Sequence, residues 1–549
     1  MSSCGQVLLA AAVGWWLASS GRGAAGGERV AAGEGASGMV SLSVVDAQTR
    51  QPLPARVRIR DGAGQDHVPQ GAVQVRIAKD RWFVTEGTVE LAMPAGGVSV
   101  RVERGTEYRP VKGAMTVRPG ETTRHEVALQ RWINMRDRGY VSGEDHLHVP
   151  VKELTAMLAA EGLDFGTSLS WWNRPALAVP PGEGWVRDLA YAGQVRPASV
   201  YDAEVEHEWG AVYLIGLRGP VTIEAGGDRS NLPYVKWARQ QGALVCYQGG
   251  WSREVLIDAL LGCVDVVNVC NNNFHRHKFQ PRRRYSNLLK VEGFGEYPET
   301  PLGMMEMNTE TYYRLLNCGL RLAAGAGSAT GAKSTPVGYN RAYVGAGEKP
   351  TLQGFLQAWR AGRNFVTNGP MLFLTAGRQE PGAGGGEQAL GPGDTLDLAG
   401  EGGRIHVKAA AMSDQPLRSL EIVVNGQVAH RAVLDGDRES AELSWSAQVS
   451  QGSWVAARCT GEDRLLSDEE LAEYRLEQGN VEEPCRLRFG HTSPIYVTVG
   501  GRGVRLPAAI AEAQRMLDAF ERFARERGGE AYRAEITEAL AAARVRLRP

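Results

Sequence analysis

The chain carries a short run of residues whose side chains bind metal ions. Residues 142–148 read SGEDHLH, with one residue between His146 and His148. On an extended backbone, alternate side chains point to the same face, so both imidazoles can reach one ion. A polar loop without a metal ion has the same pattern, and the spacing alone leaves that alternative open. We predict His146 and His148 as metal ligands.

A second pair of histidines has the same spacing. His275 and His277 lie in residues 271–277 (NNNFHRH), directly after residues 264–270 (VDVVNVC), which are typical of a buried strand. Loops that follow the strands of an α/β barrel form its active site. We therefore predict His275 as a further metal ligand, because three protein ligands and a water suffice for a catalytic zinc ion.

Aromatic and basic side chains near these histidines predict substrate contacts. Trp171 and Trp172 end an extended segment, and their faces suit a sugar or an aromatic ester, although tryptophan also packs in cores. Arg276 begins a basic run beside His277, which either receives a phosphate or carboxylate or lies in a solvated loop. We predict Trp171, Trp172, His277 and Arg276 as substrate-binding residues.

The elements that position these residues alternate between helices and strands. Residues 150–162 have helical spacing with Gly162 at the end, and an extended segment follows. Later segments predict helices that begin at Asn308 and Thr351. This alternation predicts one α/β domain over residues 131–375, with a barrel-like arrangement.

The flanking regions predict β-structure. Residues 39–130 contain short alternating strands separated by turns, which is typical of a β-sandwich. Residues 394–500 alternate in the same way and predict a second β-sandwich-like module. Residues 507–549 predict a helical tail interrupted at Gly528 and Gly529. The 68 glycines and 26 prolines among 549 residues agree with this many turns.

The first residues resemble an export signal. Residues 7–18 (VLLAAAVGWWLA) form an uncharged apolar run of 12 residues. A membrane-spanning helix needs about 20 residues, whereas a signal peptide needs fewer. We predict residues 1–25 as a signal peptide, with Met39 as an alternative start, and expect export to the periplasm or the extracellular space. No other run approaches spanning length, so we expect no membrane span after signal removal.

The charge balance excludes one class of partner. The chain has 61 Lys and Arg residues against 62 Asp and Glu residues, a formal net charge of −1. Such a chain has no overall positive field to attract nucleic acid. The expected partner is a small-molecule substrate or a carbohydrate, and not nucleic acid.

Two segments resemble known families. Residues 139–150 (GYVSGEDHLHVP) resemble the opening motif GWYSGDTHVH of the CehA/McbA-type metallohydrolases, whose central domain is similar to the polymerase and histidinol phosphatase (PHP) fold. The likeness continues in order through residues 337–344 and 361–372 to the segment that begins at His491. Residues 44–61 resemble the carboxypeptidase-regulatory-like domains, which implies a spacer or interaction module without catalysis.

The first resemblance implies a fold and a site. It implies a distorted PHP-like βα barrel, flanked by two β-sandwich-like modules and the helical tail, with a divalent metal ion (Zn, Mn or Fe) at its C-terminal rim. It also implies Glu206, which precedes a strand as an acidic residue does in that family, as a ligand, with His207 as the alternative. Where the family has TDH, HP and GSD, this chain has SWWN (170–173), YQGG (247–250) and GSA (327–329). Three expected ligand positions are therefore non-ligating.

Two functions follow from these residues. The first is an exported, metal-dependent hydrolase-like protein that acts on a small ester, amide or phosphoester through a metal-bound water. Its ion would be held by His146, His148, Glu206 and His275. The alternative is a non-catalytic binding protein for a carbohydrate or a protein partner on the same scaffold. The residues leave open whether the chain is an enzyme.

Overall fold

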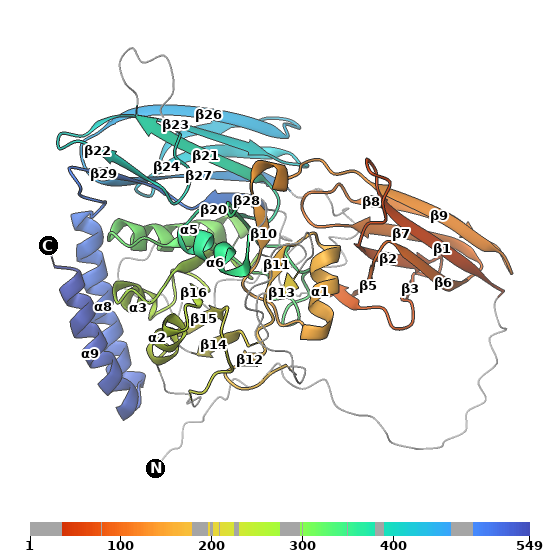
Figure 1. Cartoon of the computed structure of the whole chain (residues 1–549), viewed down its shortest axis with the longest axis horizontal. Coiled ribbons are helices and arrows are strands. Elements are labelled where there is room, and N and C mark those ends of the chain that lie inside the picture. The colour runs from red at the N-terminus through yellow and green to blue at the C-terminus, as the bar shows by residue number, and fades with distance from the viewer. Residues whose placement is uncertain are drawn as a thin grey trace.

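The structure is a computed structural model. It describes residues 36–77, 79–177, 196–197, 201–207, 209–223, 230–274, 297–298, 300–347, 350–378, 389–462 and 487–548. Figure 1 shows a β-unit at one end of the molecule, a pair of long helices at the other, and mixed helices and strands between them. The predicted combination of α/β and β architecture is confirmed.

The N-terminal unit consists of two sheets. One has the order β6 (Thr88–Pro94), β1 (Ser37–Asp46), β9 (Thr122–Leu129). The other has the order β4 (Gln74–Ile77), β5 (Asp80–Thr85), β2 (Ala55–Asp61), β7 (Gly96–Glu103), β8 (Val111–Val117), with β3 (Asp66–His67) beside β2. Apolar residues alternate along the strands, so each sheet places one face against a shared core that includes Val40, Val57 and Phe83.

A six-stranded sheet forms one half of the central region. Its order is β12 (Trp171–Trp172), β14 (Ala203–His207), β15 (Gly210–Ile215), β16 (Leu244–Tyr247), β17 (Val266–Cys270), β18 (Ala323–Ala326). The helices of this half are α2 (Leu232–Gln240), α3 (Val255–Leu260) and α5 (Pro301–Asn317). Strands β15 to β18 are buried along their whole length, because helices and other strands cover both faces of the sheet.

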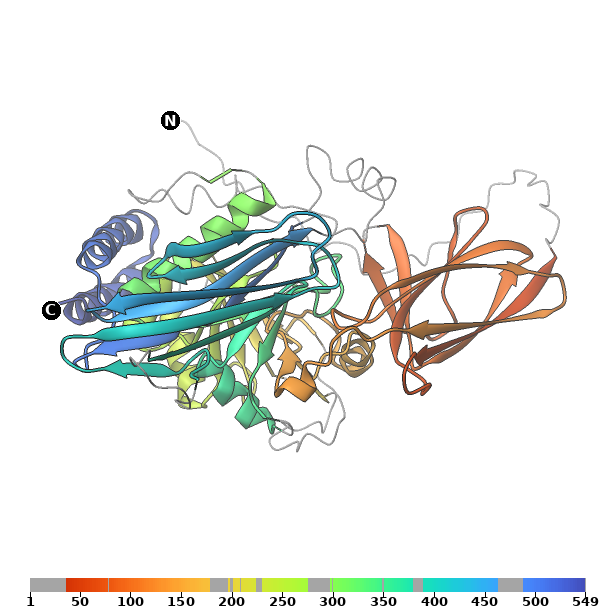
Figure 2. The ribbon, with the colours of Figure 1, turned by 90° about the horizontal axis from the view of Figure 1, so that it is seen from above.

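A longer sheet connects the central region to the C-terminal β-module. Its order is β13 (Arg196–Pro197), β11 (Phe165–Gly166), β10 (Val141–Gly143), β19 (Arg341–Val344), β20 (Asn364–Thr367), β28 (Leu487–Thr492), β27 (Ser453–Glu462), β24 (Leu417–Val424), β25 (Gln427–Val433). Strands β22 (Thr395–Leu398) and β29 (Ile495–Val499) join it at β27, and β21 (Met371–Arg378), β23 (Gly403–Met412) and β26 (Ser440–Val449) form a separate sheet. Figure 2 shows these long strands lying over the central region. Short helices η1 (Arg136–Arg138), α1 (Val151–Ala160) and α6 (Leu352–Arg360) complete this half.

One predicted helix begins earlier than its sequence suggests. Asn308 does not cap a helix; it is buried in the middle of α5, which Thr300 caps by accepting from the Gly303 amide at 3.1 Å. A threonine followed by a proline is a strong start signal, because proline fits the first helical position. The Asn308 side chain instead accepts from Trp251 Nε1 (3.2 Å) and donates to the Val269 carbonyl (3.1 Å).

The predicted helical tail forms two helices that pack on the central region. Helices α8 (Pro507–Arg527) and α9 (Glu530–Arg546) are separated by Gly528 and Gly529. Tyr532 of α9 stacks on Trp209, with ring centroids 4.0 Å apart, and its hydroxyl donates to Glu254 Oε1 at 2.8 Å. In the part of the chain that the structure describes, no helix has the length and apolar character needed to cross a membrane.

Two buried carboxyl groups near this contact predict a pH-dependent stability. Burial, and then the charge of Asp258, raises the pKa of Glu254 well above its ordinary value; burial also raises the pKa of Asp258 to about 7. The folded chain therefore keeps protons that the unfolded chain releases above about pH 4. We expect the free energy of unfolding to fall as the pH rises from about 4 to 7.

Denaturant titrations across this pH range check the expectation. The variant Asp258→Asn should show a shallower pH dependence, whereas Asp435→Asn, at an exposed position, should match the parent. An unchanged slope in Asp258→Asn would exclude Asp258 as a source of the effect.

Candidate metal centre

Three side chains converge on one point at the edge of the six-stranded sheet. His146 Nε2 lies 3.1 Å from His148 Nε2, and Glu204 Oε2 lies 2.9 Å from His148 Nε2 and 3.5 Å from His146 Nε2. Among the His, Cys, Asp and Glu side chains of the described residues, these three form one group whose ligand atoms are close enough to share an ion. Ligand atoms around a tetrahedral zinc ion are ~3.3 Å apart, since each lies about 2.0 Å from the metal. The three side chains therefore fit a divalent ion without rearrangement.

The extended segment after β10 presents both histidines on one side. The His148 amide donates to the Thr330 carbonyl at 2.7 Å, and the Ala329 amide donates to the His146 carbonyl at 2.7 Å. Leu147, between them, is fully buried in an apolar cluster on the opposite side. The period of two along this segment thus separates the two imidazoles from the core residue between them.

Three neighbouring strands each place one side chain next to the imidazoles. Trp172 of β12 pairs with Glu204 of β14, and Glu204 pairs with Tyr213 of β15. The Trp172 ring lies 4.5 Å from the His148 ring, and the Tyr213 ring lies 4.2 Å from the His146 ring. Each imidazole therefore has an aromatic neighbour, and the carboxylate between these neighbours contacts both imidazoles.

The electrostatics favour the protonation states that bind metal. Burial alone would raise the pKa of Glu204, but the adjacent imidazoles of His146 and His148 outweigh it and lower the pKa to about 2. Burial lowers the pKa of His146. At neutral pH Glu204 is thus a carboxylate, the form that coordinates a cation. Glu204 Oε2 and His146 Nδ1 are buried and have no well-directed hydrogen bond within the described residues.

Further polar groups hold the 142–148 segment in place. Glu144 accepts from the Ser328 amide at 2.6 Å and from the Gly338 amide at 2.7 Å. Asp145 accepts from Asn268 Nδ2 at 2.9 Å, and burial raises the pKa of Asp145 to about 7. These bonds anchor both sides of the chain that carries His146.

Glu204, and not the predicted Glu206, completes the group. Both residues lie on the same face of β14, because alternate residues of a strand do so, and the sequence period could not choose between them. Glu206 is exposed at the end of the strand, where its carboxylate accepts from Trp172 Nε1 at 3.0 Å. Although the residue is exposed, loss of water around its carboxyl group, and then the charge of Glu204, raises the pKa of Glu206 to about 7. The alternative, His207, lies beside Tyr234, with ring centroids 6.4 Å apart.

The other predicted site residues have different outcomes. Trp172 is half-buried against His148, whereas Trp171 is buried in the core beside Tyr234. His275, Arg276 and His277 lie outside the described residues.

The positions that differ from the family motifs have structural partners. Tyr247 donates to Asp258 Oδ2 at 2.6 Å, and Gln248 donates to Asn272 Oδ1 at 2.8 Å. Gly327 allows a close approach, because a Cβ there would lie 2.4 Å from His146 Cβ and 2.6 Å from Asp145 Oδ1. Ala329 has a φ of 55°, a left-handed conformation. The non-ligating residues at these positions therefore support the chain around the site.

Sequence reasoning preferred Glu206 to the neighbouring Glu204 and Glu208, and it missed Tyr213 and Lys333. The Lys333 amide donates to the Ala329 carbonyl at 2.8 Å, and the charge of Lys333 acts to lower the pKa of both His146 and Glu206. The signal for Glu204 and Tyr213 was their place on paired strands, which depends on register and not on a local motif.

Comparisons with known proteins add little. No family model matches the chain, and no curated protein matches it. A part of it is similar to GBS52, the minor pilin of Streptococcus agalactiae, at 16% identity and a TM-score of 0.15 over 18% of this chain and 47% of that one. Phospholipase PlaB from Legionella pneumophila matches at 16% identity and a TM-score of 0.14 over 19% of this chain and 27% of that one. The chain spans less than half the length of either protein, and TM-scores this low carry no argument about fold or function.

The geometry predicts which glutamate binds metal. In Glu204→Gln, the neutral amide removes the anionic ligand, and we expect zinc affinity to fall by more than about 100-fold. Glu206→Gln is the matched control on the same face and should bind zinc within a few-fold of the parent. Competition with a chromogenic chelator measures both, and the opposite order would show that Glu206 is the ligand.

The close approach at Gly327 predicts a second effect. Gly327→Ala forces a methyl group against His146 and Asp145, so we expect a loss of about 1–3 kcal/mol in the free energy of unfolding together with weaker zinc binding. Gly219→Ala is the control, because a Cβ at Gly219 meets no atom within 4 Å. Equal stability of the two variants, measured by denaturant titration, would contradict the close packing.

Proposed function

We propose that the chain is an exported, metal-dependent hydrolase-like protein on a PHP-like barrel scaffold, acting on a small ester, amide or phosphoester. The observation that carries the proposal is the convergence of His146, His148 and Glu204 with ligand-atom separations of 3.1, 2.9 and 3.5 Å. Two imidazoles and one carboxylate are a donor set of catalytic zinc and of non-haem iron. Three protein ligands leave a position for water or substrate.

The charge of the site supports a cation. Glu204 is a buried carboxylate, and burial disfavours a positive charge on the neighbouring His146, so a negative charge lies beside the two imidazoles. A divalent ion would compensate that charge and would lower the pKa of a water molecule, which makes a nucleophile available near neutral pH.

The residues around the three candidate ligands have roles that follow from their chemistry. Trp172 covers one face of His148 and donates its indole N–H to Glu206, which fixes the Glu206 carboxylate at the edge of the site. Lys333 brings a positive charge to the same edge and is suited to hold a carbonyl or phosphoryl oxygen as negative charge develops on it.

The second candidate is a non-catalytic binding protein. One observation favours it: Trp172 lies against His148, where it offers a half-buried aromatic face to a carbohydrate ring. A ligand stacked on this face would not need hydrolysis.

Hydrolysis assays with metal analysis separate the two functions. We expect the purified full-length chain to hold about one Zn, Mn or Fe ion and to hydrolyse nitrophenyl esters, anilides or phosphate esters, with loss of activity on chelation and recovery on adding metal. The double variant His146→Ala, His148→Ala should lose both metal and activity. Metal content near zero in the parent, unchanged in the double variant, would exclude the enzymatic function; bound metal with carbohydrate binding and no hydrolysis would favour the second candidate.

A further inference from the structure

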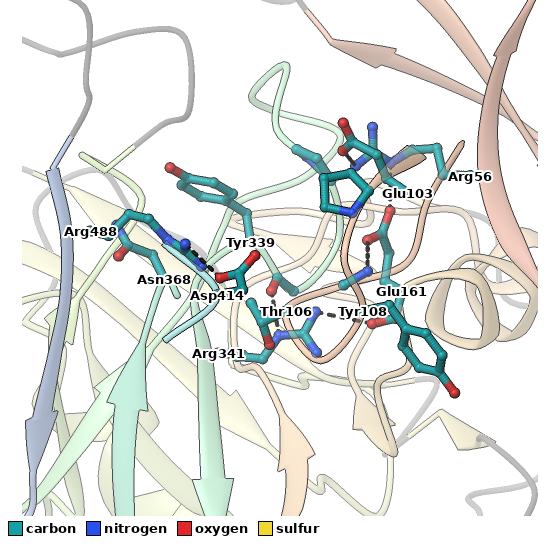
Figure 3. A pocket seen from close by; sticks show the side chains of 14 residues that line it. Arg56, Glu103, Thr106, Tyr108, Glu161, Tyr339, Arg341, Asn368, Asp414 and Arg488 are labelled. Carbon is teal, nitrogen blue, oxygen red and sulfur yellow. Dashed lines mark hydrogen bonds and ion pairs between the residues drawn. The ribbon is translucent and has the colours of Figure 1, made fainter. Parts of the chain in front are cut away.

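A cavity lies where the N-terminal β-unit meets the central region. Its volume is about 240 Å³, and its walls come from residues that follow β7, from the chain between β9 and β10, and from the end of α1. Charged side chains dominate the lining: Arg104, Glu107, Arg131, Arg136, Glu161, Asp164 and Arg341. Figure 3 shows the adjoining pocket, which shares Tyr108, Glu161 and Arg341 with this cavity.

Every carboxylate of the cavity already has an arginine partner. Glu107 pairs with Arg131 at 2.5 Å, and Asp164 pairs with Arg136. Glu161 pairs at 2.6 Å with Arg56, which is not among the residues that line the cavity. No acidic side chain of the lining is therefore left for the two remaining arginines.

Those two arginines, Arg104 and Arg341, bond mainly to backbone carbonyls. Arg341 is 1% exposed; its Nε donates to the Gly338 carbonyl at 2.6 Å and its Nη2 to the Glu161 carbonyl at 3.1 Å. Arg104 Nη1 donates to the carbonyls of Pro54 and Ala159, while its buried Nε has no hydrogen-bond partner. Among the residues that the structure describes, neither guanidinium forms an ion pair with a carboxylate.

This arrangement leaves the buried guanidinium groups of Arg104 and Arg341 without a carboxylate of their own. Burial lowers the pKa of Arg104 and the charge of Arg131 adds to the effect, whereas Tyr108 and the charge of Glu161 oppose it; the Tyr108 ring lies 5.4 Å from the Arg104 guanidinium carbon. Buried charges are costly unless they are paired, and carbonyl and aromatic contacts compensate a cation only in part. A second charge of opposite sign in the cavity would remove most of this cost.

The cavity has the size and donors for such a group. Its volume of 240 Å³ is several times the volume that one water molecule occupies in the liquid, about 30 Å³. Guanidinium forks match the paired oxygens of phosphate and carboxylate groups.

We propose that this cavity binds an oxyanion, the phosphate or carboxylate group of a small molecule, between Arg104 of the N-terminal β-unit and Arg341 of β19. The bound group would join the two parts of the chain, since Arg104 follows β7 and Arg341 belongs to the long sheet. The bound group would also help to hold the metal centre in place. Arg341 donates to the Gly338 carbonyl, and the Gly338 amide donates to Glu144 in the segment that carries His146.

Thermal unfolding of the full-length protein tests this site. Inorganic phosphate and citrate are titrated separately at constant ionic strength set with chloride, in the presence of a metal chelator. We expect the unfolding midpoint to rise with the logarithm of the concentration of at least one of the two anions, because a ligand that binds only the folded state stabilises it by mass action. The anion with the larger effect identifies the chemical group, and no effect of either anion beyond that of chloride would overturn the proposal.

Variants assign the effect to the cavity. Arg104→Met should lose the anion-dependent rise. Arg104→Lys keeps the positive charge but lacks the two-pronged guanidinium, so it should bind the anion at least about 10-fold more weakly; it serves as the test if Arg104→Met does not fold. Arg109→Gln is the control, because Arg109 belongs to the same unit but pairs with Glu439 outside the cavity. An equal rise in the Arg104 variants and in the parent would refute the assignment.

A further variant separates this site from the metal centre. The double variant His146→Ala, His148→Ala should keep the anion-dependent rise, because its substitutions lie outside the cavity lining. Loss of the rise in this variant would place the anion at the metal centre and overturn the proposal, whatever the outcome of the hydrolysis assays.

Discussion

The contact of one carboxylate with two imidazoles determines the arrangement of the central region. Glu204 reaches His146 and His148 because β14 lies between β12 and β15 in the six-stranded sheet and because the backbone of residues 326–330 holds the segment that carries the two histidines. The aromatic rings of Trp172 and Tyr213 occupy the two positions beside Glu204 and limit the movement of the imidazoles. A carboxylate buried at this depth is tolerated only with such partners or with a cation. The register of the sheet thus determines which side chains meet at the site.

The site combines rigid strands with chain segments that hold no regular structure. Glu204, the one candidate ligand on β14, is fixed by ladder hydrogen bonds, whereas the two histidines depend on Glu144, Asp145 and the backbone of residues 327–330 for their placement. This second set of contacts involves buried acids and glycines rather than apolar packing. It explains why SGEDHLH is polar along most of its length although it is buried. A functional segment with this many satisfied polar groups keeps its geometry better than a loop in solvent does.

Much of the fold followed from local patterns, and the site followed only in part. Alternating apolar residues predicted the strands of both β-regions. Helical spacing and terminal glycines predicted α1, α8 and α9, and the cap residue Thr351 predicted α6, because these signals depend on neighbours in sequence. The spacing of His146 and His148 predicted their shared direction for the same reason. Glu204 could not be distinguished from Glu206 in the sequence. Which of the two glutamates lies beside the histidines depends on how β14 pairs with β12 and β15, and no local motif shows that pairing. Trp171 and Trp172 are adjacent in sequence but point to opposite sides: Trp171 is buried in the core beside Tyr234, and Trp172 is half-buried beside His148.

The pairing of β20 with β28 has a consequence for how the chain can be divided. Thr367 lies opposite Gly490, so residues more than a hundred positions apart form one ladder between the central region and the C-terminal β-module. Contacts of this separation make folding slow, because the intervening chain must be ordered before they form. A fragment that ends after β21 would leave β20 with an open edge, and open edges recruit strands from other molecules. The central region is therefore an incomplete folding unit without the residues that follow it, whichever activity it carries.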